Sequence, residues 1–529
     1  MGHAGEPANG GTLVIALPSD PGPILPPLAT STYVDAVVWQ LFDHLADLPG
    51  DRNMVGDAGF RPHLADAWKW SPDSLAIAFH LNPRARWHDG VPVRATDVRF
   101  TFRAYRDPSL GSAWTEALAR IDSVTVADSL TAIVHFSRRY PQQFFDAVQQ
   151  MLIIPEHLLG GIAPPEWRSS DFAQHPVGSG RFRFARRVPG ASLTLHADTA
   201  NYAGRPHVAT LIFDVAPNSE EAARRFLDGR ADFIPALSAA DRSDLAQHRR
   251  LRLITWPSTG LGFLEFNLRT PILADAAVRR ALSMGVDRAA IVQHVFGGFA
   301  IVATGPLPRS EWLGDTTVLP PPFDRAAARQ LLDSAHWAVV APDGIRYKAG
   351  RPLRFTITVA NTNASRARLA EILQGEFRRL GADVQIELVD FSTYLTILNA
   401  GHFDAAMFAG TTASPAAELH EEWGSHSLAV DGGGNASNYA NPTFDALVDS
   451  ATSNNDLTQA RRQMHRALET IMGDAPAIWL FEQRNAGGID RRVHAAPLLA
   501  DDWWAGLADW WIDPSDAIAR DGLRTSLPR

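Results

Sequence analysis

The chain has 529 residues and a net charge of −9 from 49 basic and 58 acidic residues, and it contains no cysteine. At roughly 150 residues per domain, this length predicts three or four structural units with sizeable cores. A mildly acidic, well-mixed chain without a basic stripe argues against nucleic acid as a partner, and the lack of cysteine excludes disulfides, thiolate catalysis and Cys-ligated metals.

The first elements are predicted to be a buried strand and a helix. Residues 13–17 form an apolar run that a proline-rich loop ends, and residues 33–48 carry apolar side chains at helical spacing. Between residues 61 and 154 short strand-like pieces follow, and two alternating runs separated by "ADS" predict a hairpin. No apolar run is long and unbroken enough to span a bilayer, so we expect a soluble protein.

The second half of the chain alternates strands with helices. The segment "NSEEAARRFLDG" predicts a capped helix closed by Gly229, and "DRAAIVQHVFGG" predicts another between Asp287 and Gly297. Residues 353–409 read as β-α-β-α, which predicts a mainly parallel sheet. The last strong strand is "APAIWLFEQR", and a tail with four tryptophans follows it.

The stretch "RARWHDGVPVRATDVRFTF", residues 84–102, predicts a stiff turn followed by a helix. Asp89 and Gly90 form the turn signal, and Thr96 or Asp97 is the predicted helix cap. The stretch holds neither paired carboxylates nor a nucleophile beside a base, so we interpret it as scaffold.

The order of motifs resembles the extracytoplasmic solute-binding proteins of peptide/nickel-type ABC importers, solute-binding protein family 5. "WHDGVPVRATDVRFTF", "HPVGSGRFRF" and "LEFNLRTPILADAAVRRALSMGVDRAAIVQHVFGG" are similar to the family's signature segments. "SNYANPTFDALVDSA" and "DAPAIWLF" follow in the same order. Each segment alone is a weak signal, but their order along nearly the whole chain is specific.

This resemblance implies a periplasmic-binding-protein-like α/β fold with two α/β lobes joined by two crossover segments. We expect lobe one at residues 11–48, 160–264 and 487–529, a β-rich domain inserted in it at 49–159, and lobe two at 265–486. The residues agree with this division, since the β-rich stretch interrupts an α/β pattern and "LGFLEFN" and "IWLFEQR" lie where the chain would cross over.

Capture of a solute between two closing lobes requires aromatic surface and a few fixed polar groups from each lobe. In α/β sheets such groups follow the carboxyl ends of strands. The predicted substrate-binding residues are Ser19, Asp20, Trp256, Ser258 and Thr259 from lobe one and its crossover, and Phe408, Thr411, Thr412, Ser414, Asn435, Asn438 and Tyr439 from lobe two. For each of them the alternative is a turn or capping role.

Two charged groups bear on the nature of the ligand. Arg366, near a predicted helix start, is where the resemblance implies an arginine that holds a peptide carboxylate, although a solvated first-turn arginine is an equal alternative. Peptide binders of the family often carry an aspartate soon after the strand "FDAAMFA", but here "GTTASPAA" follows. Asp20 could supply that charge instead, and without it recognition of a free peptide ammonium is in question.

Other constellations favour structural roles. His420 and His426 flank two glutamates without the His-Glu-x-x-His spacing, so we predict neither a metal site nor a cofactor. The tail residues Trp503, Trp504, Trp510 and Trp511 either line the cleft or pack the tail, and packing is favoured.

We therefore predict a non-catalytic, monomeric component of an ABC importer that captures a peptide or peptide-sized solute and delivers it to the permease subunits. Its location would be periplasmic or extracytoplasmic, with a lipid anchor left open by the N-terminus. The alternatives are a non-peptide ligand (a sugar oligomer, an opine-like conjugate or a nickel chelate) and, less favoured, a metal-dependent hydrolase built on His420 and His426. A transcription regulator would need a helix-turn-helix for which residues 1–12 leave no room.

Overall fold

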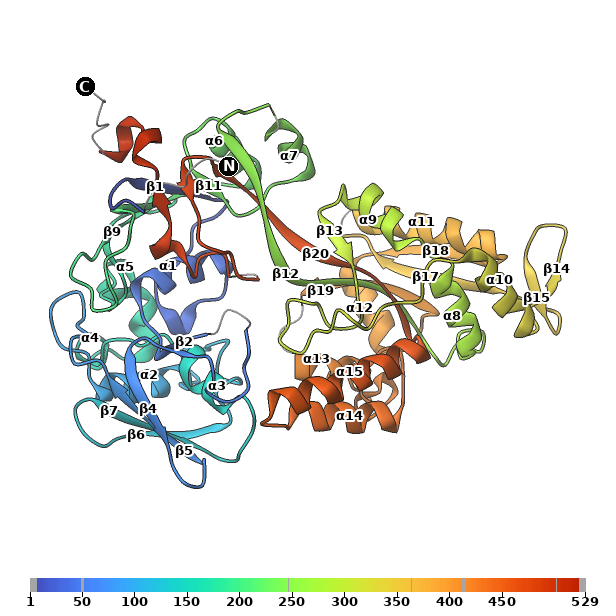
Figure 1. The fold of residues 1–529 in the computed structure, drawn as a ribbon, viewed down its shortest axis with the longest axis horizontal. Coiled ribbons are helices and arrows are strands. Elements are labelled where there is room, and N and C mark those ends of the chain that lie inside the picture. Colours follow the sequence, from blue (N-terminus) through green and yellow to red (C-terminus); the bar gives the residue numbers. More distant parts are fainter. Residues whose placement is uncertain are drawn as a thin grey trace. The chain divides into compact units, whose positions relative to one another are not determined.

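The computed structural model describes residues 7–48, 52–245, 247–362, 364–411, 415–500 and 502–522. The chain divides into two compact units, unit 1 with Met1–Trp256 and Asn485–Arg529 and unit 2 with Pro257–Arg484 (Figure 1). The chain passes from one unit to the other within two long strands, β12 (Leu251–Phe266) and β20 (Ala477–Asp490). The α/β class with two crossover segments is thus confirmed, whereas the division of lobe one into two bodies stays a prediction.

The main sheet of unit 1 has the strand order β20-β11-β1-β10-β9-β8. Its strands besides β20 are β1 (Thr12–Leu17), β8 (Phe182–Val188), β9 (Ser192–Ala197), β10 (Thr210–Val215) and β11 (Phe233–Ile234). β1 is parallel to β10 and β11, while β10, β9 and β8 are antiparallel neighbours. Leu13 and Ile15 join one hydrophobic core and Val14 and Ala16 another, so β1 is buried on both faces.

A second sheet of unit 1 is antiparallel, with the order β4-β5-β7-β6. It consists of β4 (Ala65–Trp70), β5 (Ala76–Leu81), β6 (Ile121–Val126) and β7 (Thr131–Phe136). The pair β6–β7 is the predicted hairpin around "ADS". Beside this sheet lies α2 (Ala95–Tyr105), whose N-cap is Arg94 rather than the predicted Thr96 or Asp97. Asp97 lies in the first turn, and its carboxylate accepts the Arg94 backbone N–H at 2.8 Å.

The helices of unit 1 fill the space around these sheets. They are α1 (Thr32–Leu41), α3 (Gln143–Gln149), α4 (Glu156–Leu159), α5 (Asp171–Gln174), α6 (Ser219–Leu227) and α7 (Ala239–Leu245). Helix α6 has the predicted Asn218 cap and ends before Gly229, whose φ is +75°. Helix α1 is shorter than predicted, because the Leu41 carbonyl accepts the Gly180 N–H and residues 46–47 pair with 61–62 as strands β2 (Ala46–Asp47) and β3 (Arg61–Pro62).

The sheet of unit 2 has the order β18-β17-β19-β12-β20, and β13 (Ala300–Val302) pairs with β20. Strands β17 (Arg354–Ala360), β18 (Asp383–Val389) and β19 (Ala405–Thr411) are mutually parallel, as the β-α-β-α pattern predicted, and β12 is antiparallel to β19. The connecting helices are α11 (Ala364–Leu380) and α12 (Phe391–Asn399). All three parallel strands therefore end at the same edge of the sheet.

Further helices complete unit 2. They are α8 (Ala276–Met284), α9 (Arg288–Phe296), α10 (Arg325–Ser334), α13 (Pro415–Trp423), α14 (Pro442–Thr452) and α15 (Leu457–Asp474), the last two side by side in Figure 1. Helix α9 has the predicted Asp287 cap and ends at Gly297, with φ +57°. A small sheet of β14 (Val339–Val340), β15 (Arg346–Lys348) and β16 (Arg351–Pro352) follows α10.

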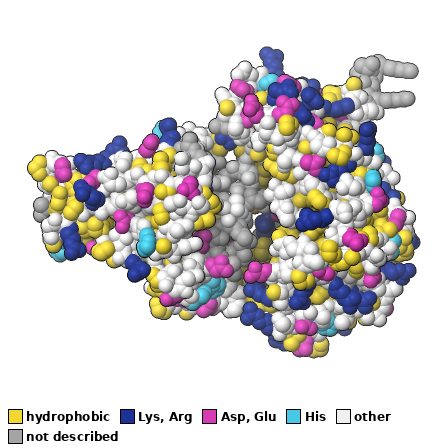
Figure 2. Space-filling view, turned by 180° about the vertical axis from the view of Figure 1, so that it is seen from behind, with side chains coloured by type: hydrophobic (Ala, Val, Ile, Leu, Met, Phe, Trp, Pro, Cys, Tyr) yellow, Lys and Arg dark blue, Asp and Glu magenta, His cyan; other side chains and the backbone are white. Residues whose placement is uncertain are grey.

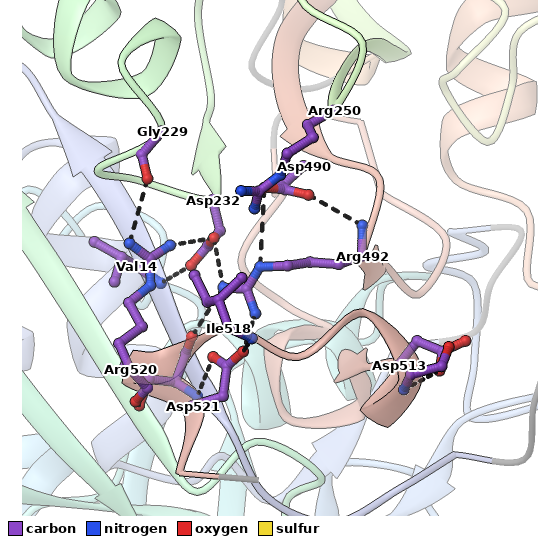
Figure 3. Close-up of polar contacts among 12 residues, drawn as sticks. Val14, Gly229, Asp232, Arg250, Asp490, Arg492, Asp513, Ile518, Arg520 and Asp521 are labelled. Carbon is purple, nitrogen blue, oxygen red and sulfur yellow. Dashed lines mark hydrogen bonds and ion pairs between the residues drawn. The ribbon is translucent and has the colours of Figure 1, made fainter. Parts of the chain in front are cut away.

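A buried ion-pair network joins the C-terminal residues of unit 1 to its main sheet (Figure 3). The Arg492 guanidinium donates to Asp232 at 2.6 Å and to Asp521 at 2.5 Å, and these three side chains are at most 2% exposed. Arg520 also pairs with Asp232, whose second oxygen accepts the Val14 N–H of β1. Every carboxylate of this network thus has a cation, as a buried charge requires.

The surface mixes both charges. On the face shown in Figure 2, Lys and Arg side chains are interspersed with Asp and Glu rather than gathered in one basic stripe. None of the described helices combines the length and the hydropathy needed to cross a bilayer.

Candidate functional site

The candidate site in unit 1 is a cavity of about 90 Å³. Its walls combine aromatic rings with carboxylates: Asp35, Trp39, Tyr105, Trp114, Asp502 and Trp504. These side chains come from α1, the end of α2, the following loop and the C-terminal tail. The cavity therefore exists only once distant parts of unit 1 have packed together.

Helix α1 places two of these groups by its own geometry. Ser31 caps the helix by accepting the Val34 N–H, and Asp35 and Trp39 lie one turn apart on the same face. The other face of α1 is buried in the core. The helix thus presents an acid and an indole together toward the cavity that both of them line.

The electrostatics of the cavity are unusual. Among the described residues, the Asp35 carboxylate makes no hydrogen bond or ion pair, and burial together with repulsion from Asp502 raises the pKa of Asp35 to about 6. Asp502 accepts from Arg52 Nη1 at 3.1 Å. Burial also raises the pKa of Tyr105, whose hydroxyl oxygen accepts the Leu152 N–H, so that phenol stays neutral. Asp502 thus has a guanidinium partner, whereas Asp35 has none among the described residues.

In unit 2 the candidate surface is the edge at which β17, β18 and β19 end. Arg366 of α11 donates to the Ala409 carbonyl of β19 at 2.7 Å, which fixes its guanidinium beside this edge. Phe391 at the start of α12 is 52% exposed, and Leu388 and Leu395 nearby are also exposed. Phe408 stacks on Phe263 with ring centroids 4.8 Å apart. The edge thus combines a positioned cation with apolar surface.

The predicted residues of the first loop and crossover have partners of their own. The Asp20 carboxylate accepts from Arg187 at 2.5 Å and from the Gly22 and Gly190 N–H groups, which lowers its pKa against the opposing effect of burial. Ser19 is exposed in the same loop. Trp256 is buried against Phe233.

The next two residues along the crossover belong to unit 2. Ser258 is buried and its hydroxyl accepts the Gly260 N–H, and Thr259 is also buried. Ligand contact by these residues, as by those of the first loop, stays a prediction.

The predicted residues of lobe two fall into two groups. Phe408, Thr411 and Arg366 lie at the carboxyl edge described above. Asn435, fully buried, donates to the Gly424 and Tyr439 carbonyls, and the Tyr439 hydroxyl donates to Asp474 at 2.7 Å. Asn438 sits beside them in the left-handed region with φ +55°. These three hold a turn together, while Thr412 and Ser414 lie outside the described residues.

Several residues of the site were not predicted from the sequence. Asp35, Trp39 and Trp114 line the unit 1 cavity, and Phe391 is exposed at the unit 2 edge. The acid–indole spacing on α1 is a readable signal, because it places both groups on the face opposite the apolar stripe. Trp114 lies in a loop, and no sequence pattern marks it.

The tail tryptophans are all buried in unit 1, and one of them also lines the cavity. Trp503 and Trp510 pack on Phe233 with ring centroids 5.2 and 5.0 Å apart, and Trp511 stacks on His494 at 3.9 Å. Trp504 instead lines the cavity with Asp35. Contact of any of the four with a ligand stays a prediction.

The histidine pair considered for a metal has other neighbours. The rings of His420 and His426 lie 5.6 Å apart, and His420 Nε2 faces Thr452 at 3.3 Å and Asp449 at 3.6 Å. Within the described ranges, no three His, Asp or Glu side chains are arranged to hold a metal ion.

Comparison with known proteins identifies similar chains. Residues 59–420 match the model for the middle region of family 5 of the bacterial extracellular solute-binding proteins. Oligopeptide-binding protein AppA of Bacillus subtilis is 23% identical over 513 residues, covering 96% of this chain and 93% of its own.

Two solved structures are similar in fold. HbpA2 from Haemophilus parasuis superposes with a TM-score of 0.81 at 21% identity, covering 95% of this chain and all of the other. NikZ from Campylobacter jejuni in complex with Ni(L-His) superposes with a TM-score of 0.69 at 23% identity, covering 94% and 99%.

Proposed function

The chain belongs to family 5 of the bacterial extracellular solute-binding proteins, and on that premise we propose that it binds a peptide for an ABC importer. AppA, similar over nearly the full length of both chains, is an oligopeptide-binding protein. Members of the family work outside the cytoplasm. The observation that carries the proposal is this full-length similarity, together with a carboxylate-and-aromatic cavity in unit 1.

Each unit contributes recognition chemistry of its own. In unit 2 the Arg366 guanidinium, anchored to the Ala409 carbonyl, is a candidate partner for a ligand carboxylate. Exposed Phe391 offers apolar surface for ligand side chains. In unit 1 Asp35 and the surrounding indoles offer the opposite charge. A peptide carries both charges and apolar side chains, which is why we favour it over a sugar oligomer.

We propose that the ligand is released unchanged and that the protein acts as a monomer delivering it to permease subunits, without nucleic acid. Carboxylates and indoles recognise a cation by charge and dispersion and form no covalent bond with it. If the protein has more than one conformation, the ligand would favour the one that it binds more tightly, by the difference between its two affinities.

The test is a thermal-shift and calorimetric screen of the purified chain against dipeptides to pentapeptides of differing charge. A peptide present at a hundred times its Kd should stabilise the protein by about 2.7 kcal/mol. Mass spectrometry of the protein as purified should also reveal bound peptide. Absence of any peptide response, or hydrolysis of added peptides by the pure protein, would refute the proposal.

A further inference from the structure

We propose that the unit 1 cavity is a specificity pocket for an organic ammonium group, so that the solute carried by this protein is cationic at one end. This inference rests on the proposed function and goes beyond it, because it names the charge that the ligand presents to unit 1. Three features of the cavity support it: its size, its walls and its uncompensated charge.

The size of the cavity limits the ligand to a single head group. At about 90 Å³ it lies well below the roughly 300–1,000 Å³ of pockets that enclose a drug-sized ligand. A peptide backbone with side chains does not fit in that volume. An ammonium carbon–nitrogen centre with its substituents does.

The walls suit a cation that is stripped of water. Trp39, Trp114 and Trp504 supply three indoles and Tyr105 a neutral phenol. Aromatic faces attract cations through the ring quadrupole, most strongly in Trp, and sets of such rings bind ammonium and methylated ammonium groups. Trp114 is 39% exposed, whereas Trp504 and Tyr105 are buried. The cavity therefore has one aromatic wall in contact with solvent and two within the core.

The charge of the cavity calls for one positive partner. Among the described residues, the charged side chains that line the cavity are Asp35 and Asp502; Arg52 pairs with Asp502, and Tyr105 is neutral. Asp35 therefore has no cation among the described residues. A monovalent ammonium would supply Asp35 with a counter-charge, whereas a metal ion requires several oxygen or nitrogen ligands, and the described residues offer no such set here.

The experiment titrates the full chain with tetramethylammonium chloride, methylammonium chloride and the neutral isostere tert-butanol, and follows binding by calorimetry and by ligand-observed NMR. Both cations should bind and tert-butanol should not. If only tetramethylammonium binds, the ligand is a quaternary ammonium compound. If methylammonium binds as well, a primary amine such as a peptide N-terminus or a lysine side chain fits. Either result supports the pocket.

Variants then assign the binding to named residues. Asp35→Asn keeps the shape and removes the charge, and should weaken ammonium binding roughly tenfold or more. Trp114→Ala opens one wall and should weaken it several-fold. Asp122→Asn, at an exposed aspartate of β6 in the same unit, changes net charge equally and should leave affinity unchanged.

The pH dependence provides an independent readout. Because a bound cation requires an ionised Asp35, affinity should fall as the pH drops below about 6 and should become flat in Asp35→Asn. Peptides that bind while neither ammonium probe does, or probe affinities equal in wild type and Asp35→Asn, would overturn the pocket and leave the proposed function standing. Ammonium binding without any peptide binding would support the pocket and refute the proposed peptide-binding function.

Discussion

The aspartates of the buried network in unit 1 and the aspartate of its cavity differ in whether a cation accompanies the carboxylate. Asp232 and Asp521 are completely buried and both are paired with Arg492 (Figure 3). Asp35 is only half-buried, yet it has no cation among the described residues, and its pKa is raised to about 6. Burial alone therefore does not mark a functional carboxylate. The proposed pocket rests instead on a carboxylate that lines a cavity and has no counter-charge among the described residues.

Unit 2 contains an intermediate case. Glu265 on β12 is 6% exposed, and its carboxylate is near that of Glu422 on α13. Burial, and then repulsion by Glu422, raises the pKa of Glu265 to about 8 against a hydrogen bond from the Ser437 N–H. With its pKa raised in this way, the carboxyl group remains protonated at neutral pH.

The largest change in the free energy of unfolding is expected in the buried network, where every carboxylate is paired with an arginine. Arg492→Ala leaves Asp232 and Asp521 buried without their shared guanidinium, and should lower the free energy of unfolding by about 3–5 kcal/mol. Urea denaturation at neutral pH measures it. Arg250→Ala is the control, because its pair with Asp490 is 59% exposed at the arginine and should cost under about 1 kcal/mol. Equal losses in both variants would contradict the comparison.

The next effect tests the protonated carboxyl. Below pH 4.5 Glu265 is protonated in both states; as the pH rises toward 8 the unfolded state loses its proton first, so the free energy of unfolding falls with pH. Glu265→Gln removes this dependence. The variant should be more stable than wild type by about 2 kcal/mol at pH 9, with the difference shrinking toward pH 5. Denaturation at both pH values checks it, and a constant difference would refute the raised pKa.

A smaller effect of the same sign is expected at the cavity. The folded-state pKa of Asp35 is raised, so its ionisation destabilises the protein as the pH rises from about 4 through 6. Because the group is partly exposed, Asp35→Asn should raise stability at pH 8 by only about 1 kcal/mol, with no gain below pH 4. If the same variant also loses ammonium binding, Asp35 lowers stability in the wild type and contributes to ligand recognition. A destabilised variant would instead assign Asp35 to the scaffold.

The smallest effect concerns a predicted binding residue. Asp20 is anchored by Arg187 and by two backbone N–H groups, so its pKa is lowered and its pairing stabilises the folded state above the unfolded pKa of about 4. Asp20→Asn should cost about 1 kcal/mol or less at pH 7. Peptide affinity decides between the roles, since an unchanged Kd makes Asp20 a loop anchor and a tenfold loss makes it a ligand contact.

The sequence predicted the elements whose causes are local. The apolar run of β1, the Asn218 and Asp287 caps and the alternation of β17 to β19 with helices all depend on neighbours within a few residues. The prediction was wrong at the end of α1, where the Leu41 carbonyl meets Gly180, far along the chain. Tertiary contacts decided that boundary.

The same distinction explains the candidate site. Arg366, Phe408 and Thr411 follow parallel strands, so topology places them at one edge. The cavity of Asp35, Trp114 and Trp504 joins residues hundreds of positions apart, and only the folded chain shows that Asp35 has no cation beside it in the described part of the chain. A missing partner cannot be read from a pattern of residues that are present.

The attachment of the tail to β1 has a consequence for how the chain is made. The Thr12 backbone N–H donates to the Asp521 carboxylate and the Thr12 hydroxyl donates to the Arg520 carbonyl, so β1 is held by residues that lie 509 and 508 positions further along the chain. During synthesis, unit 2 has all its sequence before residues 520 and 521 of unit 1 are made, so β1 has its strand neighbours but not these tail contacts. We therefore expect unit 1 to complete its fold only after the whole of unit 2 has been synthesised.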